Sequence, residues 1–225
     1  MSGVPAAVGF VPSAPLLVPQ VAGGSASQDE ELREACRTVA RRLAAHTIGE
    51  VVVIADTSVS GEWDDSATWG FEGFGVARRP GDDRPRLPWQ LGVGAWLLDE
   101  IGWAGRRRFV SADRPASVTG GDAVLVVGDG SARRTEKAPG HFDDRAEQYD
   151  ATIATAIATG DHAALGALDV GLSAALMCAG APAWRALAAL VGQATVQRAE
   201  LLSDSAPYGV AYFAGYWLLA GGEPE

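Results

Sequence analysis

Three apolar runs rich in β-branched residues predict buried β-strands. They span residues 7–12, 51–56 and 123–129, and each ends in a turn-forming or polar residue. Runs without polar alternation are typical of parallel strands that are covered on both faces. Apolar residues recur at helical spacing over 29–46 and again over 91–101. This alternation of strands and helices predicts an α/β fold with a mostly parallel central sheet flanked by helices.

The second half of the chain begins with an Ala-rich region over 143–190 that contains almost no β-branched runs. This composition predicts about three packed helices. Gly160, Gly171 and Pro182 are the expected breaks between them.

Two further strands are expected near the C-terminus, over 194–203 and 208–219. The second is aromatic and apolar on both faces, as in a strand at the centre of a sheet or at a contact between subunits. A homodimer or larger homo-oligomer is therefore one expectation for this protein.

The segment 58–89 stands apart because its aromatic residues alternate with Gly, Asp and Pro without a helical period. A loop of this length in a compact domain is usually functional. Two interpretations stay open, a hydrophobic cluster beneath a surface loop and a lid over a substrate. The aromatic residues are Trp63, Trp69, Phe71, Phe74 and Trp89.

Composition and charge narrow the class of protein. The chain has 225 residues, 48% of them hydrophobic, which is enough to bury the core of a single domain spanning 1–225. Lys and Arg number 18 against 28 Asp and Glu, and the formal charge of −10 argues against a nucleic-acid partner. Apolar stretches such as 210–219 are much shorter than the ~20 residues of a membrane span. No targeting segment is apparent, so we expect a cytoplasmic protein without membrane contact. Cys36 and Cys178 lie in predicted helices and are expected to be buried free thiols.

The candidate site follows from the expected sheet. In open α/β sheets, ligands bind beyond the carboxyl ends of the parallel strands. Residues that follow the late strand 194–203 would reach the same crevice. The residues expected to line the crevice and bind a small molecule are Ser13, Asp56, Thr57, Asp129, Ser131, Arg133, His141 and Tyr208.

Three aspartates at these strand ends offer one kind of chemistry. Asp56, Asp129 and Asp204 supply only oxygen ligands, which suit Mg²⁺ or Ca²⁺. The alternative is that they cap turns, because Asp-Thr-Ser and Gly-Asp-Gly-Ser are sequences in which the carboxylate bonds its own backbone. The Gly-rich segment 128–134 would also present backbone N–H groups to an anion, although it matches no known phosphate-binding pattern.

Acid–base chemistry is a further expectation. His141 lies in Pro-Gly-His-Phe, a loop sequence near the crevice, and joins Asp56 and Asp129 as a candidate general acid or base. A surface role for His141 is the alternative. Neither a H-x-x-x-H pair nor a G-x-S-x-G elbow is present, so the sequence shows no zinc motif and no hydrolase triad.

Residues 10–19, Phe-Val-Pro-Ser-Ala-Pro-Leu-Leu-Val-Pro, resemble the opening Pro-His-Pro-Pro-Leu-Leu-(Val/Ile)-Pro signature of the class III extradiol ring-cleavage dioxygenases and their Memo-like relatives. Other segments agree in the same order. Residues 51–57 are similar to the family's second strand, 128–134 to its Gly-Asp-Leu-Ser-His-Arg segment, 138–150 to the stretch after it, and 208–213 to its closing strand. The resemblance covers nearly the whole chain and implies the family's α/β fold.

The resemblance also implies an iron site that this chain does not repeat. Family enzymes hold non-haem Fe(II) with two histidines and a carboxylate. The matching positions here are Ser13, Thr57 and Ala132. We therefore expect a protein that keeps the fold, has lost the iron site, uses no cofactor, and binds a small molecule or a protein partner. The alternative is an active enzyme, either an Fe(II) dioxygenase of catechol-like rings with other ligands or a metal-independent catalyst using the acid–base candidates.

Overall fold

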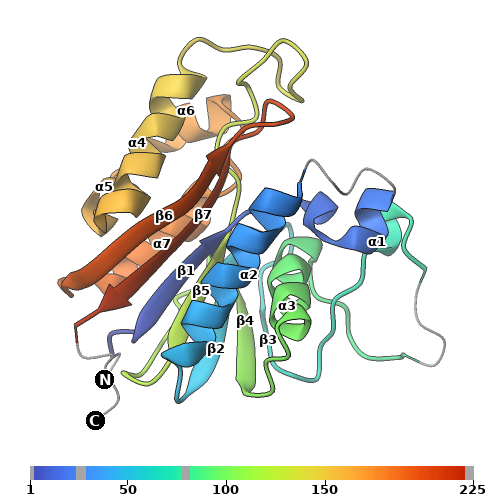
Figure 1. Cartoon of the computed structure of the whole chain (residues 1–225), viewed down its shortest axis with the longest axis vertical. Coiled ribbons are helices and arrows are strands. Elements are labelled where there is room, and N and C mark those ends of the chain that lie inside the picture. The colour runs from blue at the N-terminus through green and yellow to red at the C-terminus, as the bar shows by residue number, and fades with distance from the viewer. Residues whose placement is uncertain (1–2, 24–28, 78–81, 221–225) are drawn as a thin grey trace.

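A computed structural model describes residues 3–23, 29–77 and 82–220 of the chain. These residues form an α/β structure in which helices cover both faces of a seven-stranded sheet (Figure 1). The strand order is β3-β4-β2-β5-β1-β7-β6. The strands are β1 (Ala7–Val11), β2 (Glu50–Ala55), β3 (Glu62–Trp63), β4 (Arg106–Ser111), β5 (Ala123–Val127), β6 (Val196–Ser205) and β7 (Tyr212–Leu219).

The three strands predicted from continuous apolar runs are confirmed. They are β1, β2 and β5, which lie side by side with β5 between the other two. Their side chains alternate between two hydrophobic layers, so that Ala7 and Val11 of β1 face one layer while Val8 and Phe10 face the other. Every residue of β1 and β5 is buried, because helices cover both faces of the sheet.

The prediction that the sheet is mostly parallel is not correct, because the sheet is mixed. Strands β1, β2, β4 and β5 are parallel to one another, but β3 pairs antiparallel with β4, β7 with β1, and β6 with β7. For β6 and β7 the physical reason is connection length, because residues 206–211 form a short turn that joins antiparallel strands, whereas a parallel pair needs a longer crossover.

The apolar C-terminal strand β7 lies between β1 and β6. Trp217 on this strand is fully buried. Its ring meets that of Phe10 edge-on with centroids 4.6 Å apart, and its indole N–H donates to the carbonyl oxygen of Ile157 at 2.6 Å. Both faces of β7 are thus covered within the chain, so its apolar pattern requires no contact between subunits.

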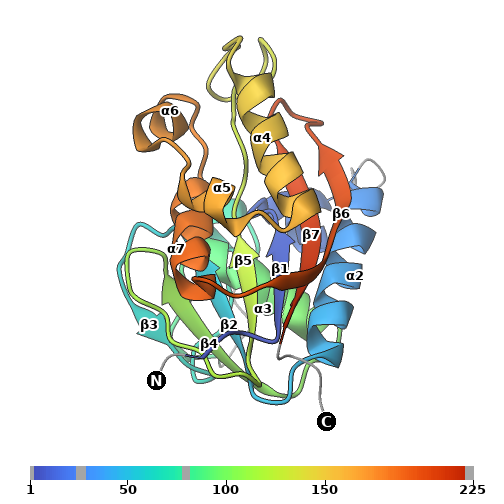
Figure 2. The ribbon, with the colours of Figure 1, turned by 90° about the vertical axis from the view of Figure 1, so that its left-hand side faces the viewer.

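The helices form two layers. In Figure 1, α2 and α3 cover one face of the sheet, and Figure 2 shows α4, α5 and α7 over the other. Among the described residues, no helix combines the length and apolarity needed to cross a membrane. The helices and short 3-10 turns are η1 (Pro15–Leu17), α1 (Pro19–Ala22), α2 (Glu30–Ala45), η3 (Glu72–Phe74), α3 (Trp89–Glu100), α4 (Ala146–Thr159), α5 (His162–Gly166), α6 (Val170–Ala175) and α7 (Ala181–Val191).

The predicted helices at 29–46 and 91–101 are confirmed as α2 and α3. The Ala-rich region forms four helices in place of about three. Gly160 ends α4 in the left-handed conformation (φ 77°), but Gly171 lies inside α6. The break falls before α6 instead, because the Asp169 carboxylate accepts a hydrogen bond from the Leu172 N–H at 2.6 Å and caps this helix.

The apolar pattern does not predict β4, because this strand opens with three arginines. The charges of two of them, Arg107 and Arg108, are paired with acidic residues on neighbouring elements. Arg108 contacts Glu50 on β2 at 2.8 Å and Glu62 on β3 at 3.0 Å, and Arg107 contacts Asp99 on α3 at 2.6 Å. Ion pairing of this kind lets charged residues form a strand next to the buried β2.

The described part of segment 58–89 packs against α3. The ring of Phe71 is buried between Trp69 and Phe74, with centroid distances of 5.7 and 6.4 Å. The Trp69 indole donates to Asp99 on α3 at 2.7 Å. A cavity of about 210 Å³ lies beside these rings, and its lining includes neither Ser13 nor Asp129. Residues 78–81 lie outside the described residues, and the lid interpretation of the segment stays a prediction.

Candidate functional site

The residues predicted to form the site lie where the parallel strands end. Strand β6 points the same way as β1, because both are antiparallel to β7. Ser13, Asp56, Asp129 and Asp204 therefore lie along one edge of the sheet. Neighbouring strands are about 4.8 Å apart, so Asp204 on β6 and Asp129 beyond β5, three strands away, are separated by about 14 Å.

This spacing contradicts the expectation that three aspartates gather around Mg²⁺ or Ca²⁺, whose oxygen ligands lie within ~2.6 Å of the ion. Over residues 3–23, 29–77 and 82–220, no three His, Cys, Asp or Glu side chains are grouped as a metal site requires. The aspartates have separate partners and environments.

Ser13 and Asp129 are brought together. Ser13 follows β1 and Asp129 follows β5, and these strands are adjacent. The backbone N–H of Ser13 donates to Asp129 Oδ1 at 2.7 Å, and its hydroxyl donates to Asp129 Oδ2 at 2.8 Å. Ser13 is buried, whereas part of Asp129 stays accessible. The structure thus presents one carboxyl group, oriented by one serine, at the edge of the sheet.

The surroundings of Asp129 favour its neutral form. Burial raises the pKa of Asp129 to about 6, and the two hydrogen bonds from Ser13 oppose this rise only in part. The loop behind it is tightly held, because the Gly180 N–H donates to the Asp129 carbonyl oxygen at 2.7 Å. Carboxyl groups whose pKa is shifted toward neutrality cluster at binding and catalytic sites.

The sequence predicts that Ser131 lines the ligand site, but the structure does not place it there. It is fully buried, its N–H donates to Asp150 Oδ1 at 2.8 Å, and its hydroxyl donates to Asp150 Oδ2 at 2.6 Å. Arg134 reaches the same carboxylate at 3.4 Å. Ser131 therefore supports the loop from inside the protein and is not accessible to a ligand.

The Gly-rich segment 128–134 is not an anion-binding cradle. Backbone N–H groups bind an anion only when they are free to point at it. Here five of them already donate to internal acceptors. The donors and acceptors are Gly128 to Val11, Gly130 to Ala211, Ser131 to Asp150, Ala132 to Leu176 and Arg134 to Gly209.

Among the described residues, no contact orients the side chain of Arg133 or His141 toward Asp129. Arg133 is half-buried, and its Nε atom has no hydrogen-bond partner among the described residues. His141 is exposed, has a left-handed backbone (φ 58°), and its ring makes no hydrogen bond within the described part of the chain. This geometry favours the surface role of His141 over an acid–base pair with Asp129.

Asp56 and Thr57 follow β2 and lie on the other side of β5 from Ser13. Asp56 is exposed, although partial burial and the charge of Asp113 raise its pKa. The Thr57 hydroxyl donates to the Val59 carbonyl oxygen at 2.8 Å. Thr57 therefore closes a local turn and does not join the Ser13–Asp129 pair.

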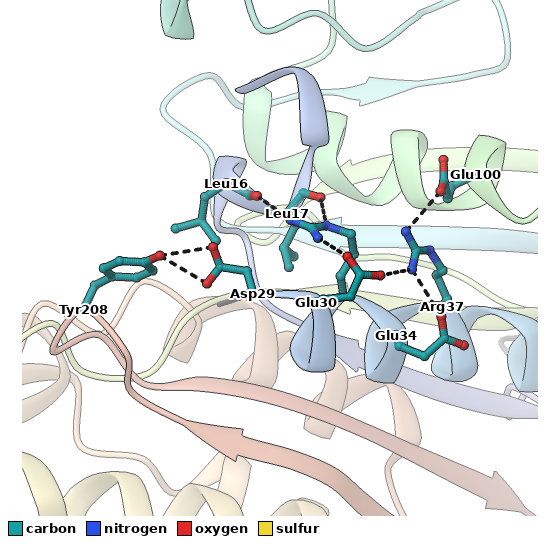
Figure 3. Close-up of polar contacts among 9 residues, drawn as sticks. Leu16, Leu17, Asp29, Glu30, Glu34, Arg37, Glu100 and Tyr208 are labelled. Atoms are coloured by element: carbon teal, nitrogen blue, oxygen red, sulfur yellow. Dashed lines mark hydrogen bonds and ion pairs between the residues drawn. The ribbon is translucent and has the colours of Figure 1, made fainter. Parts of the chain in front are cut away.

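The sequence analysis missed two residues at this end of the sheet, Asp29 and Tyr212. Figure 3 shows Tyr208 reaching from the β6–β7 connection to Asp29 at the start of α2, where its hydroxyl lies 3.1 and 3.3 Å from the two carboxylate oxygens. Tyr212, at the start of β7, is 4% exposed. Burial, and then the negative charges of Asp129 and Asp29, raise its pKa. Tyr212 therefore lies within electrostatic reach of both carboxylates.

Arg33 holds the turn between β1 and α2. It is 1% exposed, its Nε donates to the Leu17 carbonyl oxygen at 2.9 Å, and its guanidinium pairs with Glu30. A second contact reaches the Leu16 carbonyl oxygen at 3.4 Å. Because Leu16 and Leu17 follow Ser13 closely, Arg33 is a positioning residue for the crevice.

Replacing Arg33 by methionine is expected to lower the free energy of unfolding by about 2 kcal/mol, since buried carbonyl groups lose their donor while the apolar stem is kept. The matched control is Arg41→Met on the exposed side of the same helix, where the ion pair with Glu34 is worth less than about 0.5 kcal/mol. Urea unfolding of both variants measures the difference. Equal losses would contradict the role given to Arg33.

The residues that the resemblance matches to iron ligands do not fit an iron ion. The Ser13 hydroxyl is engaged by Asp129, the Thr57 hydroxyl is engaged by Val59, and Ala132 has no donor atom. A neutral hydroxyl is a poor ligand for Fe(II) compared with imidazole or carboxylate.

No protein-family model matches the chain, and a search of curated proteins finds no match either. The resemblance to extradiol dioxygenases stays a prediction.

Proposed function

We propose that this protein is an extradiol-dioxygenase-like protein that has lost its iron site and binds a small molecule without metal. The observation that carries the proposal is the Ser13–Asp129 pair. It holds a desolvated carboxyl group beyond β1 and β5, in a residue that is itself only partly buried, with hydrogen bonds of 2.7 and 2.8 Å from one serine. This is the position at which open α/β sheets bind their ligands.

We expect the buried carboxyl group of Asp129 to lower the free energy of unfolding at neutral pH, as functional groups often do. Because burial raises its pKa to about 6, the folded state binds the proton more tightly than the unfolded chain does. The stability contributed by this group is present below pH 4 and is lost as the pH rises through about 6. Asp129→Asn should therefore be more stable than the wild type at pH 8, by about 1–2 kcal/mol, and lose this advantage near pH 4.

Urea unfolding at pH 4.5, 6 and 8 measures this difference. The control is Glu147→Gln, which changes an exposed carboxylate and should follow the wild type at each pH. A variant Asp129→Asn that is less stable than the wild type at pH 8 would show that the carboxylate is structural, and the proposed site would lose its support.

The proposal is tested by ligand-observed NMR on protein treated with EDTA, against a library of small polar compounds. Binding to the wild type and its loss in Asp129→Asn support a metal-independent site. The matched control is Thr57→Val, which removes a hydroxyl at a neighbouring strand end and should leave binding intact. Binding that appears only after Fe(II) is added would overturn the proposal.

A second candidate function is a metal-independent enzyme in which Asp129 acts as general acid or base. It is favoured by the pKa of about 6, because both protonation states are then populated near neutral pH. Mass spectrometry of each bound compound after incubation at pH 6–8 separates the two functions. A compound recovered unchanged indicates a binding protein, and a compound altered only by protein with Asp129 indicates an enzyme.

A further inference from the structure

Arg133 is a half-buried cation without a counter-ion. Its Nε atom is buried and has no hydrogen-bond partner, and its guanidinium forms no ion pair within the described residues. Arg106 and Arg114 also form no ion pair there, but both are exposed, so water can hydrate them. Water does not reach the buried Nε–H of Arg133. A buried charged group is usually paired, because leaving it without a partner is costly.

The acidic residue that lies within electrostatic reach of Arg133 is bound by another arginine. This residue is Asp143, whose backbone N–H donates to the Arg133 carbonyl oxygen at 3.0 Å. Its carboxylate pairs with Arg145 at 2.7 Å. Hydrogen bonds from Arg145 lower the pKa of Asp143 to about 2, and the charge of Arg133 lowers it further. The charge of Arg133 is therefore left to a partner from outside the chain.

Two loops hold the stem of Arg133 in place. Gly140 packs so closely against it that a Cβ atom there would lie 2.7 Å from Arg133 Cγ and 2.7 Å from Met177 Sδ. The Gly140 N–H donates to the Ala132 carbonyl oxygen, and the Ala132 N–H donates to that of Leu176, both at 3.0 Å. The stem is thus fixed before any ligand arrives, which lowers the entropic cost of binding.

The backbone of these loops is strained beside Arg133. His141 (φ 58°) and Met177 (φ 54°) are the two residues other than glycine that adopt a left-handed conformation in the described part of the chain. Strain of this kind clusters at ligand clamps and active sites. The side chains of Met177 and Phe142 are exposed although both are apolar. This surface therefore combines one uncompensated positive charge with exposed apolar side chains.

We propose that Arg133 binds the carboxylate of a small monocarboxylic acid that has an apolar body. The terminal nitrogens of a guanidinium form a planar fork that matches the two oxygens of a carboxylate. Met177 and Phe142 contact the apolar body, and the flexible methionine adapts to its shape. The nearby charge of Asp143 disfavours a doubly charged phosphate, which would be repelled more strongly than a carboxylate.

This site goes beyond the proposed function, because it does not use the carboxyl group of Asp129. Burial and the hydrogen bonds from Ser13 account for the shifted pKa of Asp129, and the charge of Arg133 does not contribute. The two sites can therefore be tested independently of each other.

Isothermal titration calorimetry at pH 8 with hexanoate tests the inference, with 1-hexanol, hexylamine and inorganic phosphate as neutral, cationic and doubly charged probes. We expect hexanoate to bind and the other three not to. Arg133→Met keeps the apolar stem and should weaken hexanoate binding by about tenfold or more. The matched control is Arg114→Met, at an exposed arginine without an ion pair, which should change the affinity by less than about twofold.

The apolar contact has its own test. Met177→Ala should weaken hexanoate binding severalfold, because it removes most of the side chain beside the stem of Arg133. Val59→Ala shortens an exposed apolar side chain after β2 and should leave the affinity unchanged. Equal effects of the two substitutions would show that the apolar body does not lie against Met177, and the proposed ligand class would be wrong.

Urea unfolding guards against a structural explanation. Arg133→Met removes an uncompensated buried charge, so it should be at least as stable as the wild type. A clearly less stable variant would mean that Arg133 supports the fold, and the inference would be overturned. Absence of hexanoate binding, phosphate binding as tight as that of hexanoate, or an equal loss in Arg114→Met overturns it as well. The compound library and Asp129→Asn decide the proposed function separately.

Discussion

Gly128→Ala is expected to lower the free energy of unfolding by about 3 kcal/mol, the upper part of the range for overpacking a close-packed site. A Cβ atom at Gly128 would lie 2.4 Å from the Cα atom of Gly180, which is backbone and not a flexible side chain. To make room, β5 and the start of α7 would have to separate. This movement would break the hydrogen bond from the Gly180 N–H to Asp129.

The matched control is Gly120→Ala, because a Cβ atom there meets no atom within 4 Å and the backbone is not left-handed. Its stability should change by less than about 0.5 kcal/mol. Urea unfolding measures both variants. The lower end of the overpacking range is about 1 kcal/mol. A smaller loss in Gly128→Ala would mean that β5 and the start of α7 separate easily. Asp129 would then not be held rigidly.

Asp150→Ala is the second large effect, also about 3 kcal/mol. Asp150 is 1% exposed, and its removal leaves the N–H and hydroxyl of Ser131 buried without acceptors, each at a cost of about 1–3 kcal/mol. Loss of the contact with Arg134 adds to this. The net loss is smaller than the sum, because burial raises the pKa of Asp150 and its ionised form is itself unfavourable.

Two variants sharpen this test. Asp150→Asn keeps the shape and one acceptor oxygen, so it should lose about half as much stability. Glu147→Ala removes the exposed partner of the same arginine and should change stability by less than about 0.5 kcal/mol. Thermal and urea unfolding at pH 7 give the comparison. If Asp150→Ala were no less stable than Glu147→Ala, Asp150 would not support the loop that carries Asp129.

The elements that the sequence predicts are those in which a pattern within one segment shows which side chains are buried. The continuous apolar runs of β1, β2 and β5 are visible because both faces of these strands are covered, and the helical period of α2 is visible because one side of this helix packs on the sheet. It failed at β4, because the charges of Arg107 and Arg108 are neutralised by residues far away in the chain.

The residues of the candidate site also fall into those that the sequence predicts and those that it does not. Ser13 and Asp129 could be named in advance, because each follows a predicted strand and the ends of adjacent parallel strands lie together. Ser131 could not be separated from them, because its burial depends on Asp150, which lies on α4. Asp29 and Tyr212 look in the sequence like the start of a helix and part of an apolar strand.

By itself, the amino-acid sequence determined the α/β class, the positions of the central strands and of two helices, and which residues, Ser13, Thr57 and Ala132, stand where the resemblance would place metal ligands. These features depend on residue type and on periodicity within one segment. Only the tertiary structure decided that the sheet is mixed, that the aspartates are separate, and that Tyr212 lies within electrostatic reach of Asp129 and Asp29. Those features depend on which strands pair and which buried groups find partners, and a local pattern carries no information about contacts between distant segments.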